Sequence, residues 1–115
     1  VKELDEDLVA AHGPAIRQHE AFQPRGVNVD FFQRLDSQTL RVITYEKGVE
    51  AVMLSCASGS TAACFQAASS GPMTSPVRVI NPGGELSVEF DPSWQEVTVT
   101  GTAALVFDAE LPDDF

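Results

Sequence analysis

The sequence predicts an α+β fold in which a curved, mostly antiparallel sheet wraps around one buried central helix. Several short segments alternate between apolar and polar residues and are separated by turn residues, which is typical of hairpin-linked strands. The segment near residues 58–69 is rich in alanine and apolar on nearly every side, which is typical of a buried helix. Because the chain has 115 residues, of which 43% are hydrophobic, we expect residues 1–115 to form one domain.

The residues before this helix are expected to form two short helices and a hairpin. Acidic residues open a helix over residues 3–11, and Gly13-Pro14 is expected to end it before a second short helix at residues 15–19. After a loop, alternating residues predict two strands, which a hairpin joins most simply. These strands are residues 27–32 and 39–45.

The residues after the hairpin are expected to add the central helix and four more strands. A short apolar segment at residues 52–54 leads into the helix. The turns that separate the later strands are marked by Pro-Gly-Gly at residues 82–84 and Asp-Pro-Ser at residues 91–93. The four strands are expected at residues 77–80, 85–90, 96–100 and 103–107.

Charge and hydropathy exclude several classes of partner. The chain has 7 Lys and Arg residues against 17 Asp and Glu, a net charge of −10, whereas nucleic acids and anionic membranes attract basic proteins. No apolar run approaches the roughly 18 residues that a membrane span needs. The His and Cys residues lack the spacing of metal ligands, so no metal site is expected. We therefore expect no nucleic-acid, membrane or metal partner.

The two cysteines, Cys56 and Cys64, are expected to be reduced. If both lie on one helix, eight residues apart, their Cα atoms are separated by about 12 Å along its axis. A disulfide needs Cα atoms within roughly 7 Å of each other, so a bridge between these two residues is excluded. Reduced thiols are typical of a cytoplasmic protein, which is the localisation we expect.

Cys56 is the first candidate for chemistry, because it follows a strand and begins a helix. Free N–H groups and the helix dipole at this position favour a thiolate and can also receive an anion. The small residues Ala57, Ser58 and Gly59 leave the backbone accessible. The alternative is that Cys56 packs as a small apolar side chain, as we expect of Cys64 in the middle of the helix.

Three polar residues outside the helix are further candidates. Glu46 and Lys47 stand where a strand ends, and together they could hold the ammonium and carboxylate groups of an amino acid, although a solvated turn is equally consistent with them. Asn28 stands among apolar residues of the first strand, and its amide either points to solvent or contacts the polar end of a ligand.

Six short segments, in the same order and spacing, resemble those of the diaminopimelate epimerase family. The first three are similar to the family's Gly-Val-Asn-Val-x-Phe strand, its Tyr-Glu-Arg-Gly tract and its Ala-Cys-Gly-Thr-Gly motif. Each segment alone is a weak signal, but their common order is a strong one. The resemblance covers nearly all of this chain but only the C-terminal half of a family member. The segments are Gly26–Phe31, Tyr45–Glu50, Leu54–Gly59, Ser75–Val77, Pro82–Leu86 and Thr100–Ala103.

The resemblance implies a two-lobed amino-acid epimerase of lysine biosynthesis, of which this chain is the C-terminal lobe. In that family one cysteine from each lobe meets the substrate in the cleft between the lobes, and no cofactor is used. One thiolate removes the α-proton and the opposite thiol returns a proton to the other face, because one group cannot reach both faces of a carbon. The implied partners are an amino-acid substrate and an N-terminal lobe upstream of Val1; a homodimer remains open.

The resemblance also assigns roles to individual residues. It makes Cys56 the acid/base of the second lobe, with the backbone of Ala57 and Ser58 binding the reacting carboxylate. Glu46 and Lys47 would hold amino and carboxyl groups of the substrate, and Asn28 would contact its distal end. The upstream cysteine would be the second base, because Cys64 lies about 12 Å away along the same helix.

Four departures from the family pattern bear on the substrate. Lys47 stands in place of the family's Arg and lacks its planar, two-pronged grip on a carboxylate. Ala57 replaces a glycine, Val52 and Met53 replace polar residues, and Thr102 replaces a proline.

Two alternative functions therefore stay open. One is a divergent or non-catalytic relative that binds or acts on another amino acid. The other is a hydrolase or acyltransferase in which Cys56 is a nucleophile activated by His12 or His19.

Overall fold

The computed structural model describes residues 1–114, which form a six-stranded mixed sheet with a long helix on each of its two faces. Strands β1, β2, β4, β5 and β6 follow one another across the sheet, and the short β3 pairs with β2. The elements, in chain order, are α1 (Glu6–Arg17), the 3₁₀ turn η1 (Glu20–Phe22), β1 (Val29–Asp36), β2 (Thr39–Glu46), β3 (Ala51–Val52), α2 (Ala57–Ser70), β4 (Val77–Asn81), β5 (Gly84–Phe90) and β6 (Val97–Thr100).

The strand pairing confirms a mostly antiparallel sheet. Within residues 1–114, four strand pairs are antiparallel and one pair, β2 with β4, is parallel. A parallel pair needs a long crossover connection. In this chain β3 and α2 supply that connection, which places the first turn of α2 against the sheet.

Two apolar clusters lie on opposite faces of the sheet. Because side chains alternate along a strand, Leu40 and Val42 of β2 face α2, whereas Ile43 and Tyr45 face α1. Cys64 packs in the α2 cluster. None of the helices in residues 1–114 is long and apolar enough to cross a membrane.

Helix α2 is buried on one face only, so the expectation of a helix enclosed on all sides is not met within this chain. It contacts β1, β2 and β5, and its buried side consists of Gly59, Ser60, Ala63, Cys64 and Ala67. The opposite side is open: Phe65 is 51% exposed, and the ring of Trp94 packs on it edge-on with a centroid distance of 5.2 Å.

The expected break at Gly13-Pro14 is wrong, because α1 continues through both residues to Arg17. A Cβ on Gly13 would stand 2.7 Å from Cγ of Tyr45, so this glycine serves the close packing of α1 on β2. Pro14 lacks the N–H that would have bonded the carbonyl of Ala10, an exposed residue. Residues 15–17 are therefore the last turn of α1 and not the start of a second helix.

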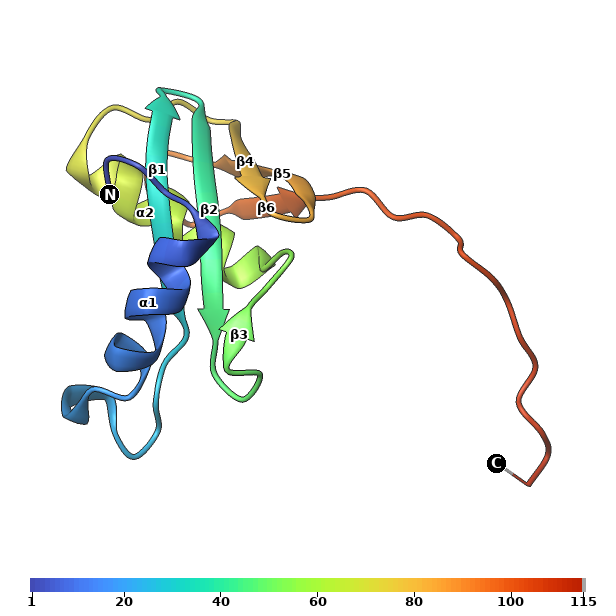
Figure 1. The fold of residues 1–115 in the computed structure, drawn as a ribbon. Helices are drawn as coiled ribbons and strands as arrows, with labels where there is room; N and C mark the ends of the chain where they lie inside the picture. The colour runs from blue at the N-terminus through green and yellow to red at the C-terminus, as the bar shows by residue number, and fades with distance from the viewer. Residues whose placement is uncertain (115) are drawn as a thin grey trace.

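The expected strand at residues 103–107 is also wrong. Residues 101–112 form no regular structure and extend away from the sheet (Figure 1). The segment has the apolar residues of a strand, but within the described residues it has no neighbouring strand to pair with. Elsewhere the expected strands are present, with β1 extending four residues further than its alternating pattern indicated.

Candidate functional site

Cys56 is the N-cap of α2, as the sequence predicts. Its backbone is extended, with φ −147° and ψ 111°, and its half-buried Sγ accepts a hydrogen bond from the Gly59 N–H at 3.3 Å. The Ser58 hydroxyl lies 3.5 Å from the same sulfur. The thiol is thus held at the N-terminal end of α2, in contact with a backbone N–H group of its first turn.

The first turn of α2 also offers backbone donors. The first four N–H groups of a helix have no partner within the helix. Here the Gly59 N–H is used by Cys56 Sγ, and the Ser60 N–H by the Cys56 carbonyl at 2.9 Å. The N–H groups of the exposed residues Ala57 and Ser58 are left to receive an anion beside the thiol.

Strand β2 brings Glu46 to the same side of the sheet as Cys56. Asp30 and Thr44 are paired across these strands and face the first turn of α2: a Cβ on Gly59 would stand 2.1 Å from Asp30 Oδ1 and 2.8 Å from Thr44 Oγ1. Asn28 and Glu46 are each two residues from this pair, toward the end of the sheet where α2 begins. Since side chains two apart in a strand share a face, Glu46 projects toward the α2 side, whereas Asn28 directly precedes β1.

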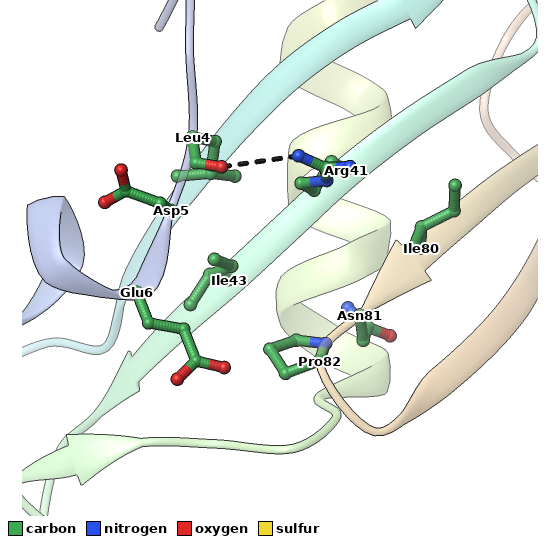
Figure 2. Close-up of a pocket in the computed structure, with 8 residues that line it drawn as sticks. All are labelled: Leu4, Asp5, Glu6, Arg41, Ile43, Ile80, Asn81 and Pro82. Carbon is green, nitrogen blue, oxygen red and sulfur yellow. Dashed lines mark hydrogen bonds between the residues drawn. The ribbon is translucent and has the colours of Figure 1, made fainter.

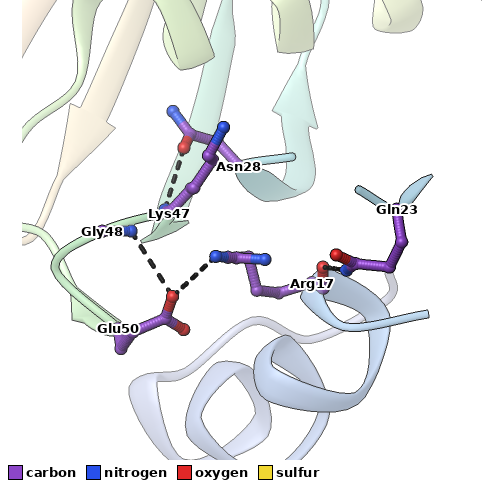
Figure 3. Close-up of polar contacts among 6 residues, drawn as sticks. All are labelled: Arg17, Gln23, Asn28, Lys47, Gly48 and Glu50. Atoms are coloured by element: carbon purple, nitrogen blue, oxygen red, sulfur yellow. Dashed lines mark hydrogen bonds and ion pairs between the residues drawn. The ribbon is translucent and has the colours of Figure 1, made fainter. Parts of the chain in front are cut away.

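A second group of contacts fixes the turn that carries Lys47 (Figure 3). The Lys47 N–H donates to Asn28 Oδ1 at 2.9 Å, which leaves the amide nitrogen of Asn28 as a donor. Glu50, at a φ of 56°, accepts from the Gly48 N–H at 3.4 Å and forms an ion pair with Arg17 at 2.9 Å. Helix α1 therefore holds this turn in place through Arg17.

Cys64 is buried, whereas Cys56 is partly exposed. Cys64 is completely buried in the α2 cluster, and this burial raises the pKa of its thiol to about 11. A protonated, enclosed thiol packs as an apolar side chain, as the sequence indicates. Both cysteines are free, in keeping with the predicted absence of a bridge between them.

The two histidines do not join Cys56. His12 lies on α1, which packs against the face opposite α2, and His19 caps η1 by accepting the Ala21 N–H at 3.1 Å on Nδ1. Among residues 1–114, the side-chain hydrogen bonds of Cys56 involve only Ser58 and Gly59. The arrangement thus gives no support to a nucleophile activated by histidine. The same residues hold no group of three His, Cys, Asp or Glu side chains that could bind a metal ion.

A pocket of about 350 Å³ lies apart from this site, on the α1 face of the sheet (Figure 2). The N-terminal segment and β2 form one side of it, where Arg41 reaches the Leu4 carbonyl at 3.5 Å. Asn81 and Pro82 form the other side at the end of β4. None of the residues predicted from the sequence as site residues lines this pocket.

Sequence reasoning missed two residues that shape the site. Asp30 could have been noticed as an acidic residue in an apolar strand, because the carboxylate must face one side of the sheet or the other. Arg17 gives no comparable signal, since a basic residue in the last turn of a helix is common for reasons of helix stability alone.

Three comparisons with known proteins are informative. The chain is 38% identical to the diaminopimelate epimerase of Aquifex aeolicus, an alignment that covers 99% of this chain and 42% of that protein. Against the diaminopimelate epimerase of Nitrosospira multiformis it is 36% identical, covering 100% of the chain and 41% of the relative. It is 42% identical to the diaminopimelate epimerase of Xylella fastidiosa, an alignment that covers 91% of this chain and 36% of that protein. No family model matches the chain.

These matches confirm the resemblance drawn from the six motifs. The chain spans about two fifths of the length of the curated relatives that it matches.

Proposed function

Because the chain is homologous to diaminopimelate epimerases over nearly all of its length, we propose that it is the C-terminal lobe of an amino-acid epimerase that needs no pyridoxal phosphate. The proposed reaction interconverts L,L- and meso-diaminopimelate. The observation that carries the proposal is the position of Cys56, a half-buried thiol at the N-cap of α2 beside two N–H groups left free for an anion. Residues 1–115 would be one domain of the whole enzyme.

The proposed chemistry needs two thiols on opposite faces of the substrate. A thiolate takes the α-proton, so that the C–H bond breaks, its electron pair stays on the substrate and the sulfur becomes a thiol. The opposite thiol then gives its proton to the other face of the carbon. Cys56 would be one of these groups, and a cysteine of an upstream lobe the other, because Cys64 is enclosed and lies on the same helix.

Charge develops on the substrate carboxylate as the α-carbon loses its proton. The N–H groups of Ala57 and Ser58 would bind that carboxylate and stabilise the charge, because preoriented backbone donors act most strongly where charge appears in the transition state. Both groups lie in the turn that also holds the thiol, so a carboxylate bound there brings the α-carbon to Cys56.

The remaining predicted site residues would bind the rest of the substrate. Glu46 would take an ammonium group and Lys47 a carboxylate. Asn28 would use its free amide nitrogen on the distal end of the substrate, since its oxygen already accepts from the Lys47 N–H. The ammonium group of Lys47 presents a single point of charge where the family's arginine is two-pronged, so the distal carboxylate would be held less rigidly.

The test is α-proton exchange in D₂O with the two-lobed protein that contains this chain. L,L-diaminopimelate is incubated with it, and deuterium at the α-carbon is read by mass spectrometry. We expect incorporation by the wild type and by Cys64→Ala. We expect neither Cys56→Ala nor the 115-residue chain alone to convert the L,L form to the meso form, which chromatography separates, because inversion of the α-carbon needs a base on each face.

Three outcomes would change the proposal. Conversion of the L,L form to the meso form by Cys56→Ala would remove Cys56 from the mechanism. Incorporation into another amino acid but not into diaminopimelate would establish a changed substrate, in line with Lys47. No incorporation with any L-amino acid of a panel would indicate a relative that binds without catalysing.

A further inference from the structure

Asn81 is a buried polar residue at the point where two strands part. The parallel pairing of β2 with β4 ends at Arg41 and Ile80. It cannot continue past Asn81, because the next residue, Pro82, has no backbone N–H. Asn81 itself is only 6% exposed. Beyond this point the edge of β2 is covered by the segment that leads to Cys56.

The Asn81 amide joins three parts of the fold at this point. Its nitrogen donates to the Val42 carbonyl at 3.1 Å and to the Ser60 hydroxyl at 3.3 Å. Its oxygen accepts from the Ser55 hydroxyl at 3.2 Å. One side chain thus links β2, the first turn of α2 and the residue that directly precedes Cys56. Figure 2 shows Asn81 and Pro82 at the end of β4, where the beginning of α2 passes behind the sheet.

Backbone contacts hold the residues before Ser55 on both sides. The Met53 N–H donates to the Thr44 carbonyl at 2.9 Å, and the Gly83 N–H donates to the Leu54 carbonyl at 2.6 Å. A Cβ on Gly83 would stand 2.7 Å from Leu54 Cβ, so the β4–β5 turn lies directly against this segment. These contacts stop at Leu54, and the next step toward Cys56 is the hydrogen bond from Ser55 to Asn81.

We propose that Asn81 is a positioning residue for Cys56, holding the thiol where the Gly59 N–H can reach it. The inference rests on the proposed function only in giving that thiol a catalytic role. A leucine at position 81 would leave the buried Ser60 hydroxyl and the Val42 carbonyl unpaired and would release Ser55. The Cys56 sulfur would then lose part of its contact with the Gly59 N–H, and with it part of its reactivity.

The test is the rate at which iodoacetamide alkylates Cys56 in the 115-residue chain, followed by mass spectrometry near neutral pH. This readout needs neither substrate nor a second lobe, so its failure is separate from failure of the epimerase proposal. We expect Asn81→Leu and Ser55→Ala each to slow alkylation by about three- to tenfold, the range that weakening one hydrogen bond gives. The double variant should be no slower than the slower single variant, because both act through one contact.

Three controls separate positioning from general loosening of the fold. Cys56→Ala should abolish the reaction, since Cys64 is enclosed. Ser69→Ala removes a serine hydrogen bond to the Phe65 carbonyl in the same helix, far from Cys56, and should leave the rate unchanged. Thermal unfolding shows which variants are folded. If Asn81→Leu is unfolded, Ser55→Ala still tests the proposal, because Ser55 is an exposed residue. An unchanged or faster rate in folded Ser55→Ala, or strictly additive effects in the double variant, would overturn the proposal.

Discussion

At Gly59 the first turn of α2 comes so close to β1 that a methyl group has no room. A Cβ there would stand 2.1 Å from Asp30 Oδ1. We expect Gly59→Ala to lower the free energy of unfolding by about 1–3 kcal/mol, the usual cost of overpacking, although alanine is the better helix former. Urea unfolding would measure this. If the contact is the cause, adding Asp30→Ala should restore part of the loss, whereas wild-type stability in Gly59→Ala would contradict it.

Cys64 makes the stability of the fold depend on pH in the alkaline range. Burial raises the pKa of its thiol from 9.0 to about 11. Above pH 9 the unfolded chain releases this proton while the folded chain retains it, so stability is present below pH 9 and is lost as the pH rises toward 11. We expect a loss of about 1–3 kcal/mol over this range. Urea unfolding at stepped pH should show less loss in Cys64→Ala; equal losses would contradict the assignment.

Single residues of the site differ in how far the sequence could predict them. Cys56 was predictable because a strand, a cysteine and a run of small residues coincide, and its place at the N-cap is confirmed. Asn81 was not, since an asparagine before Pro-Gly-Gly is also an ordinary turn residue. The contacts of Asn81 with Val42, Ser55 and Ser60 form only because β4 pairs with β2 in parallel and ends beside them.

Among the elements, α2 depends on β1 for the stability of its C-terminal end. The helix has no basic residue in its last turn. Instead Arg34 of β1 donates to the Ala67 carbonyl and the Ser70 hydroxyl, and its Nε lies 3.4 Å from Met73 Sδ. A cation here satisfies terminal carbonyls and complements the helix dipole.

Removing this cation should therefore destabilise the fold. We expect Arg34→Met to lower the free energy of unfolding by about 1–3 kcal/mol, as for a lost hydrogen bond to a charged group. Arg34→Lys should lie between this variant and the wild type. Arg78→Met is the matched control, because Arg78 pairs with Glu85 at an exposed position where ion pairs contribute little. Chemical denaturation would measure all three, and equal effects at both positions would refute the capping role.

The elements that sequence patterns mispredicted are those decided by tertiary contacts. Local rules end a helix at Gly13-Pro14, but the close packing of Gly13 on Tyr45 favours continuing α1. Local alternation predicts a strand at residues 103–107, but a strand also needs a neighbour with free backbone groups. Where the neighbour is close in sequence, as in the hairpin of β1 and β2, pattern and structure agree.

Several large apolar side chains of the molecule are exposed. Phe65 on the open side of α2 is 51% exposed, and beyond β6 the exposed fractions of Leu105, Val106 and Phe107 are 87%, 88% and 77%. Exposed apolar side chains favour binding to another surface that removes them from water. Such exposure agrees with the proposal that an upstream lobe completes the enzyme.

The extended segment after β6 should make the 115-residue chain self-associate. Its apolar side chains are exposed, and its backbone N–H and C=O groups take part in no helix or strand. Both features favour pairing with another chain. We expect sedimentation velocity to show oligomers that increase with concentration, and a hydrophobic dye to bind. Replacing Leu105, Val106 and Phe107 together by serine should reduce both signals, while Phe65→Ser tests the α2 surface separately. A wild-type chain that stays monomeric and binds no dye would contradict the proposal that this chain is one lobe of a two-lobed enzyme. The exposed apolar residues would then show no tendency to bind another surface.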